Sequence, residues 1–374
     1  MRKIIGLFIL ATTGILCTAT RAQQTKILTA DKHNEYGLVY TLPTTAMRIE
    51  VTAERTVNTA GPYYQYAKKF LRVGNAITED SEQWRITEVK VTPIGISDTE
   101  KKYLMQLKPG ALTYISVSDN GMLLAINKEV GTSAPQSGDK SLPVTEISGK
   151  GRNSEEPVRR VNPNDYLKYV NEDFLASQSS AKQAQMLAES IMEVRDSKVS
   201  LTRGTAETMP TDGRQLELML KSLTHQEAAL TAAFTGTTET TTETRGYMYT
   251  PVENGSDILF RMSDFAGFVD AGDYSGDPVN ITVDITREAE LPVDNKGEEK
   301  KLPKDAVIYA IPGTAQITLE HKGNVIWSGE MEFAQFGTTF GLAPNLFSDK
   351  RDRSYATFSP VTGALVEIGS ITEE

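Results

Sequence analysis

The sequence predicts an α+β fold in which β-rich N- and C-terminal parts flank a central antiparallel helical segment. Runs of alternating apolar and polar residues, ended by Gly or Pro, fill most of residues 37–127 and 237–368, as half-buried strands do. Residues 162–236 instead repeat their apolar residues every three or four positions, which is the period of a helix. Residues 131–161 show neither period and are rich in Gly, Ser, Pro and charge, which indicates a flexible linker or loop.

The chain begins with a segment typical of a signal peptide. Two basic residues precede an apolar run from Ile4 to Leu16, and small residues then predict cleavage between Ala22 and Gln23. The run is shorter than the about 20 residues that span a bilayer, which disfavours a permanent anchor. A lipid anchor on Cys17 is also disfavoured, because Leu16 is bulky. We therefore expect an exported protein, located in the periplasm or at the outer surface.

The composition of the exported chain argues against several classes of partner and excludes cysteine chemistry. The whole chain has 39 Lys and Arg against 49 Asp and Glu. Loss of Arg2, Lys3 and Arg21 leaves 36 against 49, a net charge of −13, which argues against a nucleic-acid or anionic-membrane partner. Cys17 is the only cysteine, so cleavage would remove every candidate disulfide and thiol. No later stretch has the length of a transmembrane segment.

The N-terminal part reads as strands with one helix and one tight hairpin. Gly61-Pro62 opens the helix, because proline suits a first helical turn, and Asp119-Asn120-Gly121 supplies the hairpin turn. The strands are expected at Gly37–Leu42, Ala46–Arg55, Trp84–Val91 and around Tyr103–Leu107, the helix at Tyr63–Val73, and the hairpin strands at Thr113–Ser118 and Met122–Asn127.

Three helices are expected in the middle of the chain. Asn162 caps the first, whose buried stripe is Leu167, Val170 and Phe174. Ser180 with Gln183 forms a capping box for the second, which ends at Gly204. The third begins at Asp212 with Gln215, ends at Gly236, and turns Leu216, Met219, Leu220, Leu223, Leu230 and Phe234 inward. The short connection predicts antiparallel packing of the last two.

The chain then returns to strands. Thr237–Thr244 has high strand propensity but little to bury, which predicts an exposed or edge strand. Further strands are expected at Ile258–Met262, Val279–Thr286, Val307–Ile311, Ala315–His321, Val325–Ser328, Tyr355–Phe358 and Ala364–Ile368. The segments in order are a signal peptide at 1–22, a β-rich domain at 23–130, a linker at 131–161, a helical segment at 162–236 and a β-rich domain at 237–374.

Two distant segments of the sequence are similar. Val39–Ala46 and Ile308–Ala315 both read as strand, proline break, strand, with Tyr40 and Tyr309 three residues before Pro43 and Pro312. Two interpretations remain open from the sequence. The segments are either a duplicated β unit or a chance similarity.

Several short motifs, taken in their order along the chain, resemble one bacterial family. It is the exported family catalogued as domain of unknown function number 4831. The resemblance runs through nearly the whole exported chain and implies an envelope protein of a Gram-negative bacterium. It carries over no catalytic, cofactor-binding or metal-binding residue. The motifs are Gly37-Leu38-Val39-Tyr40 with Leu42-Pro43, Gly61–Ala67, the helical stretch Asp212–Gly236, Phe333–Gly337 and Thr362-Gly363-Ala364.

No catalytic motif assembles from the remaining residues. His33, His225 and His321 lack a second histidine at zinc-ligand spacing, and no Gly-x-Ser-x-Gly elbow is present. The Ser-x-x-Lys pairs at Ser137–Lys140 and Ser179–Lys182 lack the partner motifs of penicillin-recognising enzymes, so we interpret them as chance. Gly149-Lys150-Gly151 lacks the strand and helix of a phosphate-binding loop.

Two features have both a functional and a structural interpretation. The loop with Asp270, Asp273 and Asp277 offers three carboxylates to calcium, but Asp and Gly also suit an ordinary turn, which is the favoured interpretation. Tyr63, Tyr64 and Tyr66 could form an aromatic platform for sugars or peptides, but packing is favoured. No catalytic, cofactor or metal residue is therefore assigned.

The sequence favours a non-catalytic envelope protein with a structural or binding role and an unknown protein or glycan partner. The alternative is a secreted hydrolase with dispersed carboxylates, which would leave little local signature because its two acids act from separate strands. A cleft with two facing carboxylates, one with a raised pKa, would favour the hydrolase. A calcium-stabilised adhesive module is a third possibility.

Overall fold

The computed structural model describes residues 37–105, 114–130, 146–148, 161–348 and 353–371. The expected signal peptide, His33, the Ser137–Lys140 pair and Gly149-Lys150-Gly151 lie outside these residues, as do Leu107 and Thr113.

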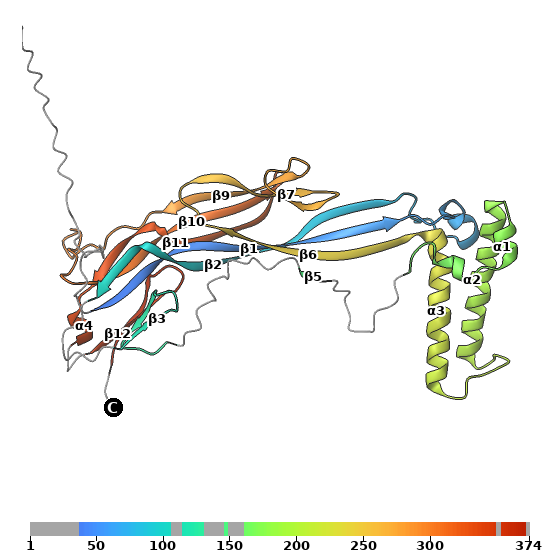
Figure 1. Ribbon diagram of the computed structural model, residues 1–374, viewed down its shortest axis with the longest axis horizontal. Coiled ribbons are helices and arrows are strands. Elements are labelled where there is room, and N and C mark those ends of the chain that lie inside the picture. Colours follow the sequence, from blue (N-terminus) through green and yellow to red (C-terminus); the bar gives the residue numbers. More distant parts are fainter. Residues whose placement is uncertain (1–36, 106–113, 131–145, 149–160, 349–352, 372–374) are drawn as a thin grey trace, which may run out of the picture.

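The molecule is elongated, with a β-rich body at one end and a helical hairpin at the other (Figure 1). Its strands form three sheets, with the orders β2-β1-β6-β5 (sheet 1), β11-β10-β9-β7-β8 (sheet 2) and β13-β12-β4-β3 (sheet 3). The strands are β1 (Leu38–Thr59), β2 (Ser81–Met105), β3 (Ile115–Val117), β4 (Leu123–Ile126), β5 (Glu146–Ser148), β6 (Thr237–Tyr249), β7 (Gly255–Ser263), β8 (Gly267–Val269), β9 (Asp277–Arg287), β10 (Val307–His321), β11 (Asn324–Leu342), β12 (Ser354–Phe358) and β13 (Leu365–Ser370).

Two apolar cores hold the body together. Sheet 1 packs on sheet 2 through Met47, Ile49 and Val51 of β1, the face that the alternation predicted, against buried residues of β7, β9, β10 and β11. Sheet 3 packs against the first residues of β1 and β10, where Tyr40 and Ile308 are buried with its apolar side chains.

The strands of the two β-rich parts are interleaved. β6, which follows the helices, pairs with β1 from Met47 to Thr59, and β12 pairs with β4. The expected boundaries near residues 130 and 237 therefore separate segments of chain rather than independent sheets.

β1, β2 and β6 extend beyond the body as an arm that ends at the helices (Figure 1). β1 alone has 22 residues, a length of roughly 70 Å at the usual rise of a strand. At the tip, the amide of Tyr63 donates to the carbonyl of Ala233 at 2.8 Å, and that of Ile77 donates to Thr235 at 2.9 Å. A Cβ on Gly61 would lie 2.4 Å from the Ala233 oxygen, so the absence of a side chain allows this close approach.

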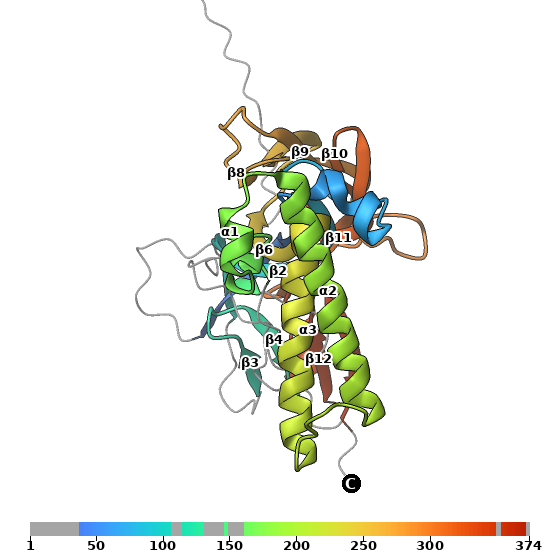
Figure 2. The same cartoon turned by 90° about the vertical axis from the view of Figure 1, so that its right-hand side faces the viewer.

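The helical hairpin consists of α2 (Ser180–Arg203) and α3 (Gly213–Thr235), which lie side by side and antiparallel in both views (Figures 1 and 2). The ends at Gly204 and Gly236 and the cap at Asp212 are confirmed, since Asp212 accepts from the amide of Gln215 at 2.7 Å. Leu230 and Phe234 of the expected α3 stripe are buried, whereas Met219 is exposed.

The helix expected to begin at Asn162 differs from the sequence prediction, as does the one expected at Tyr63–Val73. From Asn162 the chain makes only a 3₁₀ turn, Asp165–Lys168, because Asn162 and Asp165 bond to nearby backbone amides and compete with a helix. A separate short helix, α1 (Glu172–Ala176), follows and is capped by Asn171. Phe174 is buried as expected, but Leu167 is 51% exposed and Tyr166 takes the inner position.

The expected capping box at the start of α2 is also wrong. Ser179, one residue earlier than Ser180, caps the helix by accepting from the amide of Lys182. The side-chain amide nitrogen of Gln183, Nε2, instead donates to the carbonyls of Phe174 and Ser177, which ties α1 to α2. The helix expected at Tyr63–Val73 is a 3₁₀ turn, Tyr64–Tyr66, followed by a π turn, Ala67–Leu71.

The strands are longer than the sequence indicated. Pro43 and Pro312 do not end a strand, and β1 and β10 each run through their proline as one element. The hairpin of β3 and β4 around Gly121 is confirmed, and β6 is largely exposed as expected. β8 was not expected, and β5 lies within the expected linker, where it pairs with Thr242–Thr244 of β6.

The two proline-containing strands show the same irregularity. In the β1–β2 pair the register passes from Thr41↔Lys102 to Pro43↔Ser97, so β1 advances two residues while β2 advances five. In the β10–β11 pair it passes from Ile311↔Thr338 to Gly313↔Phe333, again two residues against five. The extra residues form a wide bulge beside each proline, which lacks the amide that regular pairing needs.

A short hairpin is attached to each of these strands by the same hydrogen bond. The amide of Thr41 donates to Gly121 at 2.9 Å, and that of Ala310 donates to Gly363 at 3.0 Å. Both glycines have positive φ, 78° and 70°, in the turns between β3 and β4 and between β12 and β13. The chain therefore contains a duplicated unit, a long hairpin with a proline bulge plus a short hairpin, formed first by β1–β4 and again by β10–β13.

The two units are joined by a buried tyrosine. The hydroxyl of Tyr40 donates to the carbonyl of Ile308 at 3.0 Å and accepts from the amide of the same residue at 2.7 Å. Burial raises the pKa of Tyr40 well above its usual value. One side chain in β1 thus satisfies both backbone groups of a residue 268 positions away in β10.

We expect Tyr40→Phe to lower the free energy of unfolding by about 1 to 3 kcal/mol, because both backbone groups of Ile308 lose their buried partner. Urea unfolding followed by circular dichroism measures the change. Tyr114→Phe is the control, since Tyr114 is 53% exposed, and a loss of equal size in both variants would contradict this role of Tyr40.

Candidate functional site

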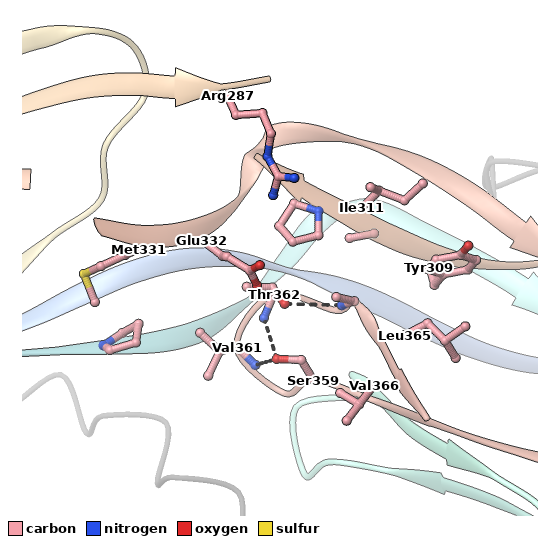
Figure 3. Close-up of a pocket in the computed structure, with 14 residues that line it drawn as sticks. Arg287, Tyr309, Ile311, Met331, Glu332, Ser359, Val361, Thr362, Leu365 and Val366 are labelled. Carbon is pink, nitrogen blue, oxygen red and sulfur yellow. Dashed lines mark hydrogen bonds between the residues drawn. The ribbon is translucent and has the colours of Figure 1, made fainter. Parts of the chain in front are cut away.

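A groove of about 800 Å³ lies beside the proline bulge of the second unit (Figure 3). Its apolar surface comes from β10 and β13, chiefly Tyr309, Ile311, Pro312, Leu365 and Val366. The turn between β12 and β13 forms the opposite wall. The groove therefore lies between the long and the short hairpin of the second unit.

The wall of the groove is a rigid turn. Ser359 Oγ accepts from the amides of Val361 and Thr362, both at 3.2 Å, and Thr362 Oγ1 accepts from the amide of Ala364. The amide of Gly363 donates to Ser359 at 2.8 Å. These local bonds fix the shape of the turn without help from a ligand.

The other side of the turn between β12 and β13 packs into the proline bulge of the first unit, at Pro43. A Cβ on Gly363 would lie 2.8 Å from Pro43 Cδ, and a Cβ on Gly95 would lie 1.9 Å from the carbonyl oxygen of Pro360. Thr45 Oγ1 also donates to the carbonyl of Val361 at 3.0 Å. The bulge at Pro43 is thus a socket that holds a polypeptide turn.

The second unit presents the corresponding socket open. Pro312 corresponds to Pro43, and Glu332 corresponds to Gly95 because it pairs with Thr314 as Gly95 pairs with Thr45. Both Pro312 and Glu332 line the groove. The duplication therefore has one filled and one open socket among the described residues.

The charges at the groove are one base and one acid. Arg287, at the end of β9, and Glu332 are both exposed and point into the groove (Figure 3). Glu332 is the one carboxylate among the lining residues. Elsewhere in the described chain, the carboxyl groups with a displaced pKa are shifted downward, as for Glu82 beside Arg55 and Glu367 beside Lys128.

The loop with Asp270, Asp273 and Asp277, for which an ordinary turn was favoured over a calcium site, contains a cation of the protein itself. The guanidinium of Arg261 donates to the carbonyls of Ala271 at 2.9 Å and Gly276 at 3.1 Å, and it stacks on Tyr274. Asp273 accepts from the amide of Ser275 and Asp277 pairs with Lys322, so these two carboxylates do not share a site. Within the described ranges, no three His, Cys, Asp or Glu side chains gather as metal ligands.

The tyrosines near Gly61 pack rather than form a platform. Tyr63 is 6% exposed, its ring lies 5.7 Å from that of Tyr166, and its hydroxyl donates to Gln183 at 3.1 Å. Tyr64 and Tyr66 are half-buried.

The remaining polar candidates are separate from the groove. Ser179 is a helix cap, and its Oγ is engaged with the Lys182 amide. His225 is half-buried on α3. His321 lies at the end of β10, where burial and then the charge of Lys322 lower its pKa.

The charged residues of the groove were not identified from the sequence. Arg287 directly follows an expected strand, and Glu332 precedes the Phe333–Gly337 motif. The local sequence around each therefore looks like that of any charged residue near the end of a strand. The similarity around Pro43 and Pro312 was the one signal that pointed to this region. Open sockets are not visible in a sequence, because filled and open sockets share the same proline.

A comparison with protein-family models gives one match. The model described as a domain of unknown function (DUF4831) matches residues 36–366, which confirms the resemblance seen in the motifs. No curated protein and no solved structure matches the chain. The match includes the first unit, the helical hairpin and the second unit as far as Val366 in β13. In the described chain, no helix is both long and apolar enough to cross a membrane.

We expect Gly95→Ala to destabilise the protein by at least about 2 kcal/mol, because the added Cβ would overlap the Pro360 carbonyl and expel the turn from its socket. Gly246→Ala is the matched control, since it also lies in a strand but meets no atom within 4 Å, and its effect should stay within about 1 kcal/mol of zero. Thermal and urea unfolding measure both. Equal stability of the two variants would contradict the socket.

Proposed function

We propose that this chain, which belongs to the DUF4831 family, is an exported, non-catalytic protein of the Gram-negative cell envelope that binds a polypeptide segment of a protein partner. The observation that carries the proposal is the pair of sockets. The bulge at Pro43 holds a polypeptide turn within the chain, and the equivalent bulge at Pro312 faces an open groove.

The chemistry of the groove favours a polypeptide over a glycan. A sugar site typically combines stacking aromatic faces with several polar groups, whereas one aromatic residue, Tyr309, lines this groove. Ile311, Leu365 and Val366 give it an apolar surface suited to small side chains. Arg287 and Glu332 add one charge of each sign, which can orient a bound segment.

A hydrolase with dispersed carboxylates receives less support. Such an enzyme needs two carboxyl groups across the bond to be cleaved, one of them with a raised pKa. The groove supplies one carboxylate, Glu332, and has no second acid among its lining residues. Binding therefore accounts for the groove better than bond cleavage does.

The arm supports a structural role alongside binding. The continuous pairing of β1, β2 and β6 separates the helical hairpin from the groove by most of the length of the molecule (Figure 1). Met192, Val199 and Leu218 are exposed on the hairpin, at 45%, 43% and 60%. We propose that the hairpin is a second contact surface, held at a distance by the arm.

Export is supported by the first 22 residues. Their basic start, short apolar run and small residues before Gln23 are the features that a signal peptidase recognises. The acidic balance of the remaining chain fits a solvated surface.

We expect protein purified from the cell envelope to begin at Gln23, because cleavage should follow Ala22. N-terminal sequencing after fractionation of the cells checks this. Ala22 is the small residue directly before the cut, so Ala22→Arg should leave the leader attached. A wild-type chain that begins at Met1 and remains in the cytosol would remove the envelope from the proposal.

A cyclic peptide that contains the turn sequence Ser-Pro-Val-Thr-Gly-Ala, residues 359–364, should bind the groove. Binding should shift the methyl NMR signals of Ile311, Leu365 and Val366, because these side chains line the groove. Val366→Glu should abolish the shifts. Ile368→Glu is the matched control, since Ile368 is exposed on the same strand but does not line the groove, and it should bind as the wild type does.

Equal binding by both variants, or shifts confined to other regions, would contradict a polypeptide site in this groove. Cleavage of the peptide by the wild type but not by Glu332→Gln would favour the hydrolase instead.

A further inference from the structure

We propose that the segment bound in the groove is the turn Ser118–Met122 of a second copy of this chain. This inference rests on the proposed function, because it names the partner of the same site. The inference follows from the duplication. The socket of the first unit holds the turn of the second unit, so by the same arrangement the socket of the second unit should hold the turn of a first unit.

The turn Ser118–Met122 is the counterpart of the turn that fills the first socket. In the first unit, Gly121 donates to the carbonyl of Ser118 and the amide of Ser118 donates to Met122, both at 2.8 Å. In the second unit, Gly363 donates to the carbonyl of Ser359 and the amide of Ser359 donates to Ala364, again both at 2.8 Å, so this turn is one residue longer. Both turns therefore use the same closing pair of hydrogen bonds, a scaffold that contains a glycine with positive φ.

The two turns differ in what they contact. Gly363 is packed against Pro43, whereas a Cβ on Gly121 would meet no atom of the described residues within 4 Å. Asp119 and Asn120, at the tip of the first turn, are exposed. The first unit therefore presents a turn with open surroundings, and the second unit presents an open socket.

The turn of the same chain does not fill the groove. The hydrogen bond from Thr41 to Gly121 and the parallel bridge between Thr41 and Met122 hold the turn on β1. None of its residues lines the groove. An occupant with this scaffold must therefore come from another molecule.

The side chains of the turn complement the groove. Asp119 supplies a carboxylate for the guanidinium of Arg287, and the amide of Asn120 supplies donors for the carboxylate of Glu332. Glu332 stands where the first socket has Gly95, so an occupant must lie farther from β11 than Pro360 lies from β2. A turn with polar side chains at its tip can bridge that larger gap through Asp119 and Asn120.

The contact joins two different surfaces of the chain. Such a heterologous contact leaves one free turn and one free groove at the ends of every open assembly, so copies would add head to tail until a ring closes. The elongated subunit would then form a chain of molecules with a helical hairpin projecting from each copy.

Disulfide trapping tests the contact, because the chain with Cys17→Ser contains no other thiol. Two differently tagged single-cysteine variants in this background, Asn120→Cys and Val366→Cys, are mixed under mild oxidation. We expect the mixed disulfide to form about tenfold more than in a mixture of Asn120→Cys with Leu175→Cys, because binding raises the local concentration of the thiols. Leu175 is 64% exposed on α1, at the opposite end of the molecule from the groove.

A charge exchange tests the chemistry. Asp119→Lys added to the first variant, or Arg287→Glu added to the second, should lower the yield of mixed disulfide about two- to fivefold. Mixing the two charge variants should restore it, because the opposite charges then face each other again. Equal yields in all combinations would show that Asp119 and Arg287 do not meet.

The outcomes separate this inference from the proposed function. A mixed disulfide no more abundant than the Leu175→Cys control, together with binding of the cyclic peptide at Val366, would overturn self-assembly and leave polypeptide binding in place. Failure of both the trapping and the peptide would overturn both. Trapping with charge rescue would establish the second copy as the partner.

Discussion

The structure depends on a buried polar contact where the two units cross. Thr45 of β1 and Gln335 of β11 exchange hydrogen bonds, from the Thr45 amide to Gln335 Oε1 at 3.0 Å and from Gln335 Nε2 to the Thr45 carbonyl at 2.8 Å. The hydroxyl of Thr45 accepts from Ala334 and donates to Val361. Because Thr45 is fully buried, each of these groups needs its partner, and the contact fixes β1, β11 and the turn relative to one another.

The end of β6 explains why this contact is possible. β6 pairs with β1 only from Met47 to Thr59, so the amide and carbonyl of Thr45 are not taken up by that strand and bond to Gln335 instead. The Phe333–Gly337 segment lies at the bulge of the second unit, and there a Cβ on Gly337 would lie 1.9 Å from the Ile311 carbonyl oxygen. The motifs that carry the family resemblance thus lie at two joints, this crossing and the contact of Gly61 with Ala233 at the tip of the arm.

The two units share a long and a short hairpin but differ in the segments that are attached to these hairpins. The first extends its long hairpin into the arm and carries the helices between β5 and β6, while the second keeps a shorter hairpin and packs its turn into the first. This asymmetry leaves the groove at Pro312 open and the turn at Gly121 uncovered. The two proposed roles, binding at the groove and assembly through the turn, both rest on this difference between the units.

Many of the local elements could be predicted from residues close together in the chain. Alternation identified the buried face of β1, and Asp212, Gly204 and Gly236 marked helix ends, because side-chain periodicity and capping depend on residues a few positions apart. The sequence also located Pro43 and Pro312, but it suggested breaks where the strands continue. The folded molecule was needed to show that Tyr40 bonds to Ile308, that β6 returns to β1, and that one socket is filled and the other open. Such contacts join residues far apart in the chain, and they are selected by which faces can be buried together with all backbone groups satisfied, a condition that no local pattern records.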